Sequence, residues 1–288
     1  MRADAGRGRS VRRAAVLGAP VGHSLSPVLH RAAYAALGLA DWTYEAVECD
    51  EARLASLLAG LDDSWAGLSL TMPLKRTVLP MLDEVSDLAL AVGGANTVVL
   101  RGGRRLGHNT DVHGIVTALA EAGLIRPDGT PGRVLIMGGG ATACSALAAL
   151  RELGAAEATV AVRETARAAE AVAAAGRLGM TVAVRTLGEL DRLPSADLVI
   201  STLPAGAADP YAALIAKSGA AVFDVVYAPW PTRLAVAVTA RGGAVVGGFP
   251  MLLHQAVRQV ELMTGRADVP VEAMRAAGTA EIARRQRG

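Results

Sequence analysis

Short apolar runs, separated by polar turns, recur along the whole chain. In the first part of the chain these runs predict strands at 14–18, 43–48 and 66–70. Between them, segments 27–37 and 51–59 have the apolar spacing of helices. Strands that alternate with helices are typical of an α/β domain with a mainly parallel sheet, so we expect this fold class for the N-terminal part.

A second series of elements follows the turn-rich segment 127–132, which is the best candidate for a domain boundary. The apolar run 134–137 leads into three glycines and an alanine-rich helix. Further apolar runs at 158–162, 198–201 and 221–225 are expected as strands, with helices between them. The chain is therefore expected to contain two α/β domains, the second of Rossmann type.

The glycines after the run 134–137 form the pattern Gly-x-Gly-x-x-Ala between a strand and a helix. This is the dinucleotide-binding fingerprint: the first glycine allows a tight turn, the second lets the backbone approach a pyrophosphate, and the alanine permits close helix packing. We therefore expect the cofactor to contact Gly138, Gly139, Gly140, Ala141, Thr142 and Ala143.

The end of the next expected strand bears on the choice of cofactor. NAD-binding folds commonly place an acid there for the ribose hydroxyls, but this chain has Val162. Arg163 and Arg167 can hold a 2′-phosphate, whereas Glu164 repels one unless an arginine pairs with it. The sequence thus predicts a preference for NADP without strict exclusion of NAD.

Lysine is almost absent from the chain, which has 27 arginines and 2 lysines. A helix is expected to start near Pro73, because proline suits the first turn of a helix, and Lys75 then lies in that turn. An ammonium group differs from a guanidinium in that its pKa can be tuned for proton transfer. Lys75 is therefore a candidate catalytic residue, with an ordinary surface cation as the alternative.

Arginines concentrate at the two ends of the chain, with five in 1–13 and three more in 284–287. Aromatic residues make up only 3%, which argues against a nucleic-acid interface. No apolar stretch is long enough to span a membrane, and the two cysteines have neither disulfide nor metal spacing. We expect both ends to be solvated tails on a cytoplasmic protein without a metal.

Several polar side chains fall next to expected helix or strand ends. Ser24 and Ser26 precede a helix N-terminus and form a plausible carboxylate site, although Ser26 as a helix cap is the simpler alternative. Asn96 and Asp111 can point into a cleft, or form a turn and cap a helix, respectively. Gln255 has helical spacing and could simply be exposed.

Taken together, five motifs resemble the shikimate dehydrogenase family over roughly residues 14–265; they are 22–27, 69–75, 94–97, 109–111 and 251–255. The resemblance implies that Lys75 and Asp111 form the catalytic pair. It further implies that Ser24 and Ser26 hold the substrate carboxylate. The substrate ring and its hydroxyls would be surrounded by Thr71, Asn96, Tyr227 and Gln255, and the nicotinamide would be bordered by Gly248 and Met251.

The resemblance also implies a domain organisation and an activity. A flexible tail at 1–13 would precede a substrate domain of 14–112 and 249–288, with an NADP-binding domain at 113–248 inserted into it. The implied reaction is the reversible, NADPH-dependent reduction of 3-dehydroshikimate to shikimate in aromatic amino-acid biosynthesis, by a monomer or homodimer. In the glycine loop, Ala141 and Cys144 replace the family's usual glycine and arginine, which predicts the loss of one cationic contact.

Two alternatives stay open. One is a sister enzyme that uses NAD with quinate, shikimate or aminoshikimate. The other is a non-catalytic protein that senses shikimate, which the presence of both Lys75 and Asp111 and of an intact glycine loop disfavours.

Overall fold

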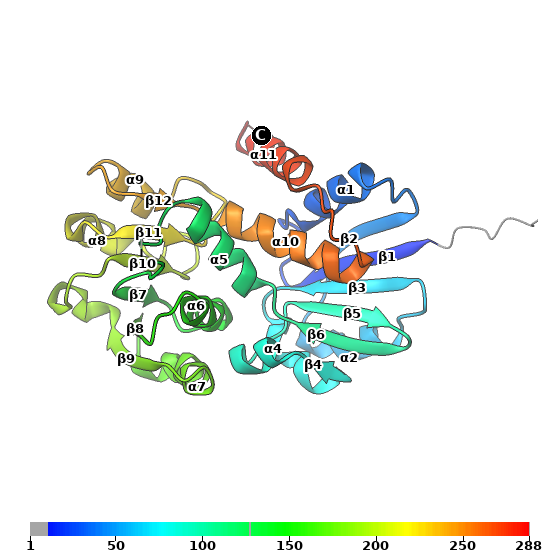
Figure 1. Ribbon diagram of the computed structural model, residues 1–288, viewed down its shortest axis with the longest axis horizontal. Helices are drawn as coiled ribbons and strands as arrows, with labels where there is room; N and C mark the ends of the chain where they lie inside the picture. Colours follow the sequence, from blue (N-terminus) through cyan, green and yellow to red (C-terminus); the bar gives the residue numbers. More distant parts are fainter. Residues whose placement is uncertain (1–10, 127, 288) are drawn as a thin grey trace, which may run out of the picture.

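The computed structural model describes residues 11–126 and 128–287, which form two sheets side by side (Figure 1). The first sheet has the order β2-β1-β3-β5-β6-β4. Its strands are β1 (Arg12–Gly18), β2 (Trp42–Glu48), β3 (Trp65–Leu70), β4 (Glu84–Val85), β5 (Thr97–Arg101) and β6 (Arg104–His108). The helices between them are α1 (Ser26–Ala36), α2 (Glu51–Ala59), α3 (Leu74–Thr77) and α4 (Asp87–Val92), with the 3₁₀ turn η1 (Leu79–Met81).

The first sheet is mixed, with β1, β2 and β3 parallel and β5 antiparallel to both β3 and β6. The β5–β6 hairpin turns at Gly102 and Gly103, whose φ angles of 59° and 74° suit the two-residue turn that glycines favour. Strand β6 was not among the expected strands because it begins with Arg104 and Arg105 and lacks an apolar run. The glycine pair was the signal that could have revealed it.

The second sheet is parallel throughout, with the order β12-β11-β10-β7-β8-β9. Its strands are β7 (Val134–Met137), β8 (Glu157–Val162), β9 (Thr181–Thr186), β10 (Leu198–Ser201), β11 (Ala221–Asp224) and β12 (Val245–Val246). Its helices are α6 (Ala141–Glu152), α7 (Ala169–Arg177), α8 (Ala212–Ser218) and α9 (Arg233–Thr239), and its 3₁₀ segments are η2 (Thr165–Ala168), η3 (Leu187–Arg192) and η4 (Asp209–Tyr211).

The central strands of this sheet match the expected apolar runs, since every residue of β7 and β10 is buried. Parallel strands that are covered on both faces need such continuous apolar sequences. Strands β9 and β12 lie at the two edges, where part of each strand faces solvent, and neither was predicted. The expected α/β fold with two mainly parallel sheets is thus confirmed, with these edge strands added.

Two helices, α5 (Asp111–Glu121) and α10 (Gly248–Thr264), pack against each other between the two sheets (Figure 1). Their close approach depends on Gly114, because a Cβ at that position would lie 2.6 Å from the carbonyl oxygen of Met251. The first residues of α5 and the first turns of α10 therefore face the same space between the sheets.

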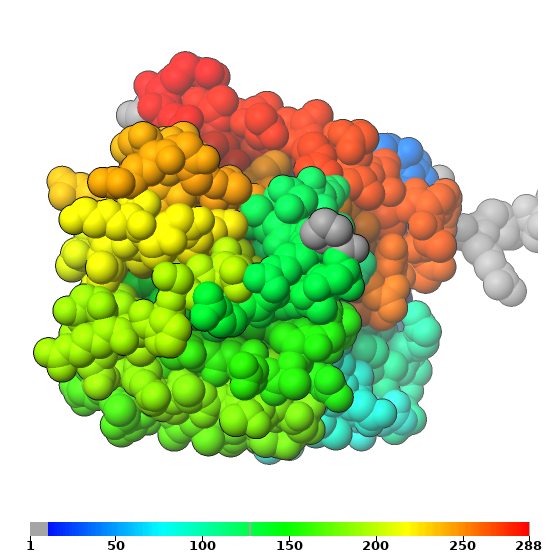
Figure 2. Space-filling view, turned by 60° about the vertical axis from the view of Figure 1, so that its left-hand side comes forward, coloured from blue at the N-terminus to red at the C-terminus, as the bar shows by residue number. Residues whose placement is uncertain are grey.

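The C-terminal arginines are not a solvated tail, as had been expected. They belong to α11 (Val271–Arg287), which packs on α1, and the red surface of α11 continues into the body of the molecule (Figure 2). Arg285 donates hydrogen bonds to the carbonyl oxygens of His23 and Ser24, at 2.6 and 3.4 Å. Arg285 therefore has hydrogen-bond partners in a distant loop, which the sequence alone did not reveal.

Arg12 and Arg13, which were expected in the tail of 1–13, belong instead to β1. The guanidinium of Arg13 lies 4.3 Å from the ring centroid of Trp65, and that of Arg12 lies 5.9 Å from Trp42, so cation–π contacts hold both arginines on the sheet. The tail at 1–10 lies outside the described residues.

Candidate active site

A cavity of about 320 Å³ opens between the two sheets and brings most of the predicted site residues together. Its walls come from β1, β3, α3, α5 and α10, together with the loop that precedes α1. The predicted residues that line it are Ser24, Ser26, Thr71, Lys75, Asn96, Asp111, Thr142, Tyr227, Gly248, Met251 and Gln255.

Lys75 and Asp111 form an ion pair on this cavity. The short helix α3 begins directly after Pro73 and carries Lys75 as its second residue, while Asp111 is the first residue of α5. The Lys75 Nζ lies 2.5 Å from the Asp111 Oδ2, and the two side chains are only 15% and 5% exposed. Lys75 is therefore not an ordinary surface cation. A charged donor beside a concave, largely buried space is suited to proton transfer.

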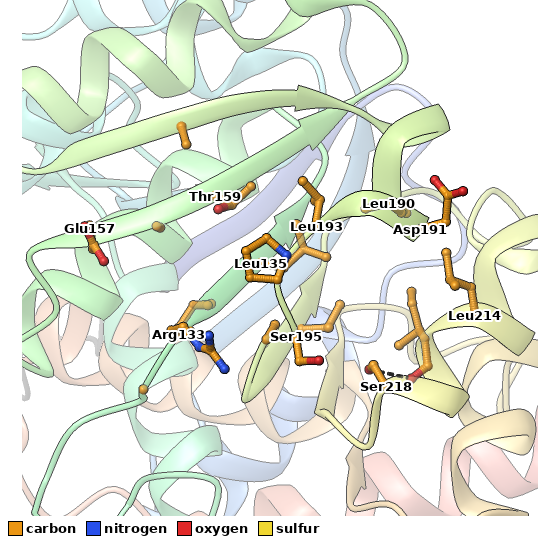
Figure 3. Close-up of a pocket in the computed structure, with 18 of the residues that line it drawn as sticks. Arg133, Leu135, Glu157, Thr159, Leu190, Asp191, Leu193, Ser195, Leu214 and Ser218 are labelled. Atoms are coloured by element: carbon orange, nitrogen blue, oxygen red, sulfur yellow. Dashed lines mark hydrogen bonds between the residues drawn. The ribbon is translucent and has the colours of Figure 1, made fainter.

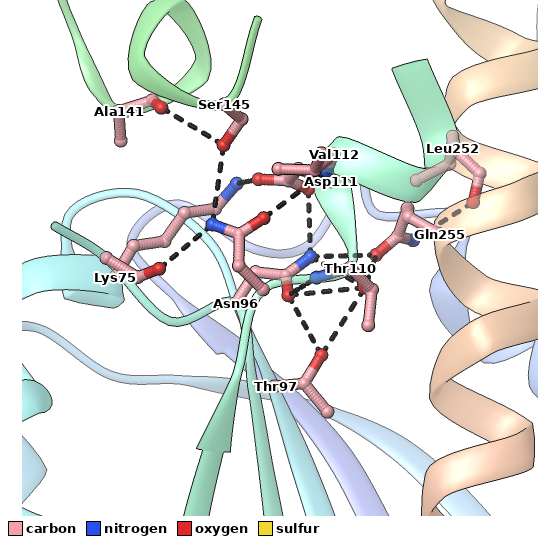
Figure 4. Close-up of polar contacts among 12 residues, drawn as sticks. Lys75, Asn96, Thr97, Thr110, Asp111, Val112, Ala141, Ser145, Leu252 and Gln255 are labelled. Carbon is pink, nitrogen blue, oxygen red and sulfur yellow. Dashed lines mark hydrogen bonds and ion pairs between the residues drawn. The ribbon is translucent and has the colours of Figure 1, made fainter. Parts of the chain in front are cut away.

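Asn96 holds the carboxylate of Asp111 from the other side (Figure 4). Its Nδ2 donates to the Asp111 Oδ1 at 2.8 Å, and its Oδ1 accepts from the backbone N–H of Thr110 at 2.7 Å. The helix-capping interpretation of Asp111 is wrong, because Thr110 occupies the cap position and Asp111 is inside the helix. Each carboxylate oxygen of Asp111 thus has its own donor.

The two serines do not act as the simple helix cap that was the alternative. Helix α1 starts at Ser26, its cap position is Leu25, and no side chain caps it. Instead the Oγ of Ser24 accepts a hydrogen bond from the backbone N–H of Ser26, at 3.2 Å. Arg285 anchors the preceding loop from α11. This arrangement leaves two hydroxyls at the cavity wall beside the start of a helix, which suits an anion.

Helix α10 contributes the wall opposite Lys75. Gln255 is buried, so the interpretation of Gln255 as an exposed residue is wrong. Its Oε1 lies 3.3 Å from the Asn96 Nδ2 that donates to it, and its Nε2 donates to the carbonyl oxygen of Leu252 at 3.0 Å. Tyr227 approaches the same space, and burial raises the pKa of its phenol, which keeps the hydroxyl protonated as a donor.

The glycine loop has the geometry that a dinucleotide needs. Gly138 has a φ of 113°, and a Cβ there would lie 2.3 Å from the Thr202 Oγ1, so only glycine fits. At Gly140 a Cβ would meet nothing within 4 Å, which leaves open space in front of the N-terminus of α6. Backbone N–H groups at such a helix start bind phosphates, so the loop fits the pyrophosphate of a dinucleotide.

The residues expected to choose the cofactor lie at the end of β8. Arg163, Glu164 and Arg167 are all exposed. Across residues 11–126 and 128–287 no ion pair joins Glu164 to either arginine, so the pairing that would have neutralised Glu164 is not present. Glu164 therefore lies beside the two arginines in sequence without an ion pair to either of them.

A cation also stands near the position where the glycine loop lacks its arginine. The Nη2 of Arg76 lies 3.6 Å from the Sγ of Cys144 on α6, and its Nη1 pairs with Glu170 on α7. Because Arg76 directly follows Lys75 on α3, these contacts join α3 to helices α6 and α7 that cover the second sheet. They place a guanidinium beside Cys144 from another part of the fold.

Among the lining residues that sequence reasoning did not assign to the site are two buried polar ones, Ser69 and Gln259. Ser69 opens the motif 69–75 but was read only as the end of a strand. Gln259 follows Gln255 by one helical turn, and this spacing was the signal that could have found it. Both are buried and hydrogen-bonded to each other, with the Ser69 Oγ donating to the Gln259 Oε1 at 2.7 Å.

A second cavity, of about 520 Å³, lies on the sheet of β7–β12 and contains none of the predicted residues (Figure 3). It extends over the starts of β7, β8 and β9, whereas dinucleotides bind beyond the carboxyl ends of such strands. Its walls are largely aliphatic, and Leu135, Leu190, Leu193 and Leu214 point into it. Its charged lining residues are Arg133, Glu157, Asp191 and Lys217, and no ion pair joins any two of these four described residues.

In the part of the chain that the structure describes, no cluster of three or more His, Cys, Asp or Glu residues could hold a metal ion. Within the same residues, no helix has both the length and the apolar character to cross a bilayer. Cys49 and Cys144 are both buried free thiols.

Comparisons with known proteins agree with this site. The model of the shikimate dehydrogenase substrate binding domain matches residues 16–98, and that of the shikimate 5'-dehydrogenase C-terminal domain matches residues 248–277. The shikimate dehydrogenase (NADP(+)) of Citrifermentans bemidjiense is 38% identical over 263 residues, which cover 88% of this chain and 89% of that protein.

Solved structures show the same likeness. The crystal structure of Mycobacterium tuberculosis shikimate dehydrogenase is 41% identical, with a TM-score of 0.83 over 93% of this chain and 99% of that one. The Thermus thermophilus shikimate 5-dehydrogenase, solved in complex with NADP(H) and shikimate, is 34% identical, with a TM-score of 0.81 over 94% and 99% of the two chains. Together with the buried lysine–aspartate pair and the glycine loop, these similarities show that the chain belongs to the shikimate dehydrogenase family.

Proposed function

We propose that this protein is a shikimate dehydrogenase that catalyses the reversible, NADPH-dependent reduction of 3-dehydroshikimate to shikimate in aromatic amino-acid biosynthesis. The observation that carries the proposal is the Lys75–Asp111 ion pair, held at 2.5 Å on a cavity that also borders the glycine-loop helix. Curated relatives with this activity cover about nine tenths of the chain.

The substrate is proposed to lie in the cavity of about 320 Å³ with its carboxylate at Ser24 and Ser26. Its ring and hydroxyls would then meet Thr71, Asn96, Tyr227 and Gln255, all of which line the same cavity. Hydroxyl and amide groups suit this task because they donate to ring oxygens without adding charge. Arg285, which grips the His23 and Ser24 carbonyl oxygens, keeps the serine loop in place.

The cofactor supplies hydride to the ring ketone when it is bound. We propose that Gly138 to Ala143 hold its pyrophosphate, Arg163 and Arg167 its 2′-phosphate, and Gly248 and Met251 its nicotinamide. Lys75, as an ammonium, donates a hydrogen bond to the oxygen on which negative charge develops and transfers a proton from Nζ to it. Asp111 keeps that ammonium in position. In the oxidation direction the neutral lysine accepts the hydroxyl proton.

We also propose the division of the chain into a substrate domain of 14–112 and 249–288 and an NADP domain of 113–248. Support comes from the two separate sheets and from α5 and α10, which run between them. A cytoplasmic location is proposed because both thiols are free, as is usual in reducing compartments. A monomer or homodimer remains the proposed assembly, and light scattering of the purified protein tests it.

One assay tests the proposed function. Purified protein is mixed with shikimate and NADP, and the absorbance of reduced nicotinamide is followed, with NAD and with quinate in parallel reactions. We expect shikimate with NADP to give the highest kcat/KM. Tight binding of shikimate without any turnover would instead identify a sensor, and faster turnover of quinate with NAD would identify the sister enzyme.

A further inference from the structure

Behind the Lys75–Asp111 pair, a chain of buried hydroxyl and amide groups crosses from β2 to the catalytic aspartate. We propose that Tyr44, Ser69, Gln259 and Thr97 form a directional hydrogen-bond relay that fixes the side-chain amide of Asn96, and through it the carboxylate of Asp111. They are positioning residues for the reaction, and this inference rests on the proposed function. Asn96 and Asp111, on which the relay acts, were expected at the site, whereas none of the four relay residues was assigned a role from the sequence.

The relay begins at a buried phenol that stays protonated and therefore always has a hydrogen to donate. Tyr44 on β2 is fully buried, and the ring of His30 stacks on it with centroids 3.9 Å apart. Burial raises the pKa of the Tyr44 phenol far above its ordinary value, so it stays protonated at every working pH. Its Oη donates to the Ser69 Oγ at 2.6 Å.

The direction of each following hydrogen bond depends on which group still has a hydrogen to donate. The Ser69 hydroxyl accepts from Tyr44 and gives its single hydrogen to the Gln259 Oε1, at 2.7 Å. The amide of Gln259 is thereby oriented with its nitrogen toward β5. There the Nε2 donates to the Thr97 Oγ1 at 3.0 Å and to the Asn96 carbonyl oxygen at 3.3 Å.

Thr97 connects Gln259 to the active-site residue Asn96. Since its Oγ1 accepts from Gln259, its own hydrogen goes to the Asn96 Oδ1, at 2.9 Å (Figure 4). The same Oδ1 accepts from the backbone N–H of Thr110 at 2.7 Å. The Thr110 hydroxyl also lies 3.2 Å from this oxygen. The loop thus contributes through Thr110 and the relay through Thr97, and these contacts leave the Nδ2 of Asn96 facing Asp111 and the Thr110 Oγ1.

The consequence falls on the carboxylate that holds the catalytic lysine. The Asn96 Nδ2 donates to the Asp111 Oδ1 at 2.8 Å, and the Lys75 Nζ donates to the Asp111 Oδ2 at 2.5 Å. If Thr97 no longer donated, the Asn96 Oδ1 would keep only its contacts with Thr110, and the amide would be held less firmly. Asp111 would then hold the Lys75 ammonium less firmly, which lowers kcat. KM should change little, because Asn96 is only one of the six proposed substrate contacts and the others are unaffected.

The test compares hydroxyl removal with hydroxyl retention at Thr97, using shikimate oxidation with NADP. We expect Thr97→Val, which keeps the shape of the side chain, to lower kcat about 10-fold, as loss of a supporting hydrogen bond typically does, with KM for shikimate within about 2-fold. Thr97→Ser, which keeps the hydroxyl, is expected to restore most of kcat. A Thr97→Ser variant as slow as Thr97→Val would show that packing matters and not the relay.

The far end of the relay has a matched control in the same cluster. Tyr44→Phe is expected to lower kcat about 3-fold to 10-fold with little change in KM. Tyr34 is also buried and lies edge-on to the same His30, but its hydroxyl has no hydrogen-bond partner within the described residues, so Tyr34→Phe should leave kcat unchanged. Equal effects of the two substitutions would overturn the proposal.

A structural readout separates the relay from the proposed function. If the unsubstituted protein oxidises shikimate and Thr97→Val is equally fast, only the relay is wrong. If the unsubstituted protein does not turn over shikimate, the function is wrong, and crystal structures decide the relay. A structure of Thr97→Val in which Asn96 still donates to the Asp111 Oδ1 at an unchanged distance would overturn it, and a rotated amide would support it.

Discussion

The two cavities described above differ more in the chemistry of their walls than in size. The larger one, about 520 Å³, is lined mainly by aliphatic side chains over the starts of β7, β8 and β9. The smaller one, about 320 Å³, gathers a partly buried lysine, a buried aspartate, serine hydroxyls and two buried glutamines from both ends of the chain. A choice based on volume alone would select the cavity that contains none of the predicted site residues.

The two cavities differ in the free-energy cost of burying the groups that line them. Burying charged and amide groups is unfavourable unless each has a partner, and in the smaller cavity Asp111, Asn96 and Gln259 all have partners. An aliphatic wall has no such requirement and needs no arrangement of donors. A convergent, satisfied polar network is therefore the stronger indicator of a catalytic site, and the following substitutions test this contrast.

The largest effect is expected from removal of the ammonium group. Lys75→Ala should lower kcat by about 1,000-fold, within the range that general acid–base groups contribute, and should change KM far less. The matched control is Lys217→Ala, which removes the chain's other lysine, an exposed residue on α8 that borders the larger cavity. Steady-state kinetics with shikimate and NADP measure both. A near-normal kcat for Lys75→Ala would return Lys75 to the class of ordinary cations.

A smaller effect, on affinity, is expected from the serine loop. Ser24→Ala and Ser26→Ala should each raise KM for shikimate about 10-fold, because a hydrogen bond to a carboxylate contributes roughly 1.5–3 kcal/mol in ground and transition states alike. Ser195→Ala, at the rim of the larger cavity, should leave KM unchanged. Calorimetric titration with shikimate provides the check, and normal binding by both loop variants would contradict a carboxylate site there.

A modest effect is expected at the cofactor end. Glu164→Thr should raise kcat/KM for NADP about 3-fold, the size of effect that exposed charges usually have, and leave kcat/KM for NAD nearly unchanged. The reason is that Glu164 stands unpaired beside Arg163 and Arg167. Kinetics with both cofactors measure the change. If the unsubstituted protein uses NAD as well as or better than NADP, the two arginines do not decide the preference.

The smallest effect is expected in the larger cavity. Thr159 lies on β8 and lines this cavity (Figure 3), so Thr159→Val should change kcat/KM by less than about 2-fold and the free energy of unfolding by less than about 0.5 kcal/mol. Kinetics and thermal unfolding are the measurements. A tenfold loss of activity would show that the two cavities communicate, and the contrast drawn between them would then fail.

Much of the fold could be predicted from the sequence, and the errors have identifiable causes. Buried parallel strands such as β7 and β10 were evident because they need unbroken apolar runs. Edge strand β9 and hairpin strand β6 were missed because solvent on one side permits polar residues there. The C-terminal arginines were misread as a tail because nothing local reveals that α11 packs on α1.

The candidate site divides in the same way. The glycine loop and the helix after Pro73 follow from local rules, since φ > 0 at Gly138 and the geometry of proline are properties of single residues. The capping interpretations of Ser26 and Asp111 were equally local and were wrong. A side chain at a helix start can turn either to its own backbone or to the cavity, and packing decides which.

The sequence by itself therefore determined the class of each element, the order of the motifs and the types of chemical group available. Only the tertiary structure decided which groups meet. Lys75 and Asp111 are 36 positions apart, and Ser69 and Gln259 are 190 apart, yet each pair is within hydrogen-bonding distance. Such pairings depend on strand order and on the close approach of α5 and α10 at Gly114. Local propensity does not encode these contacts, because they arise only when distant segments pack together.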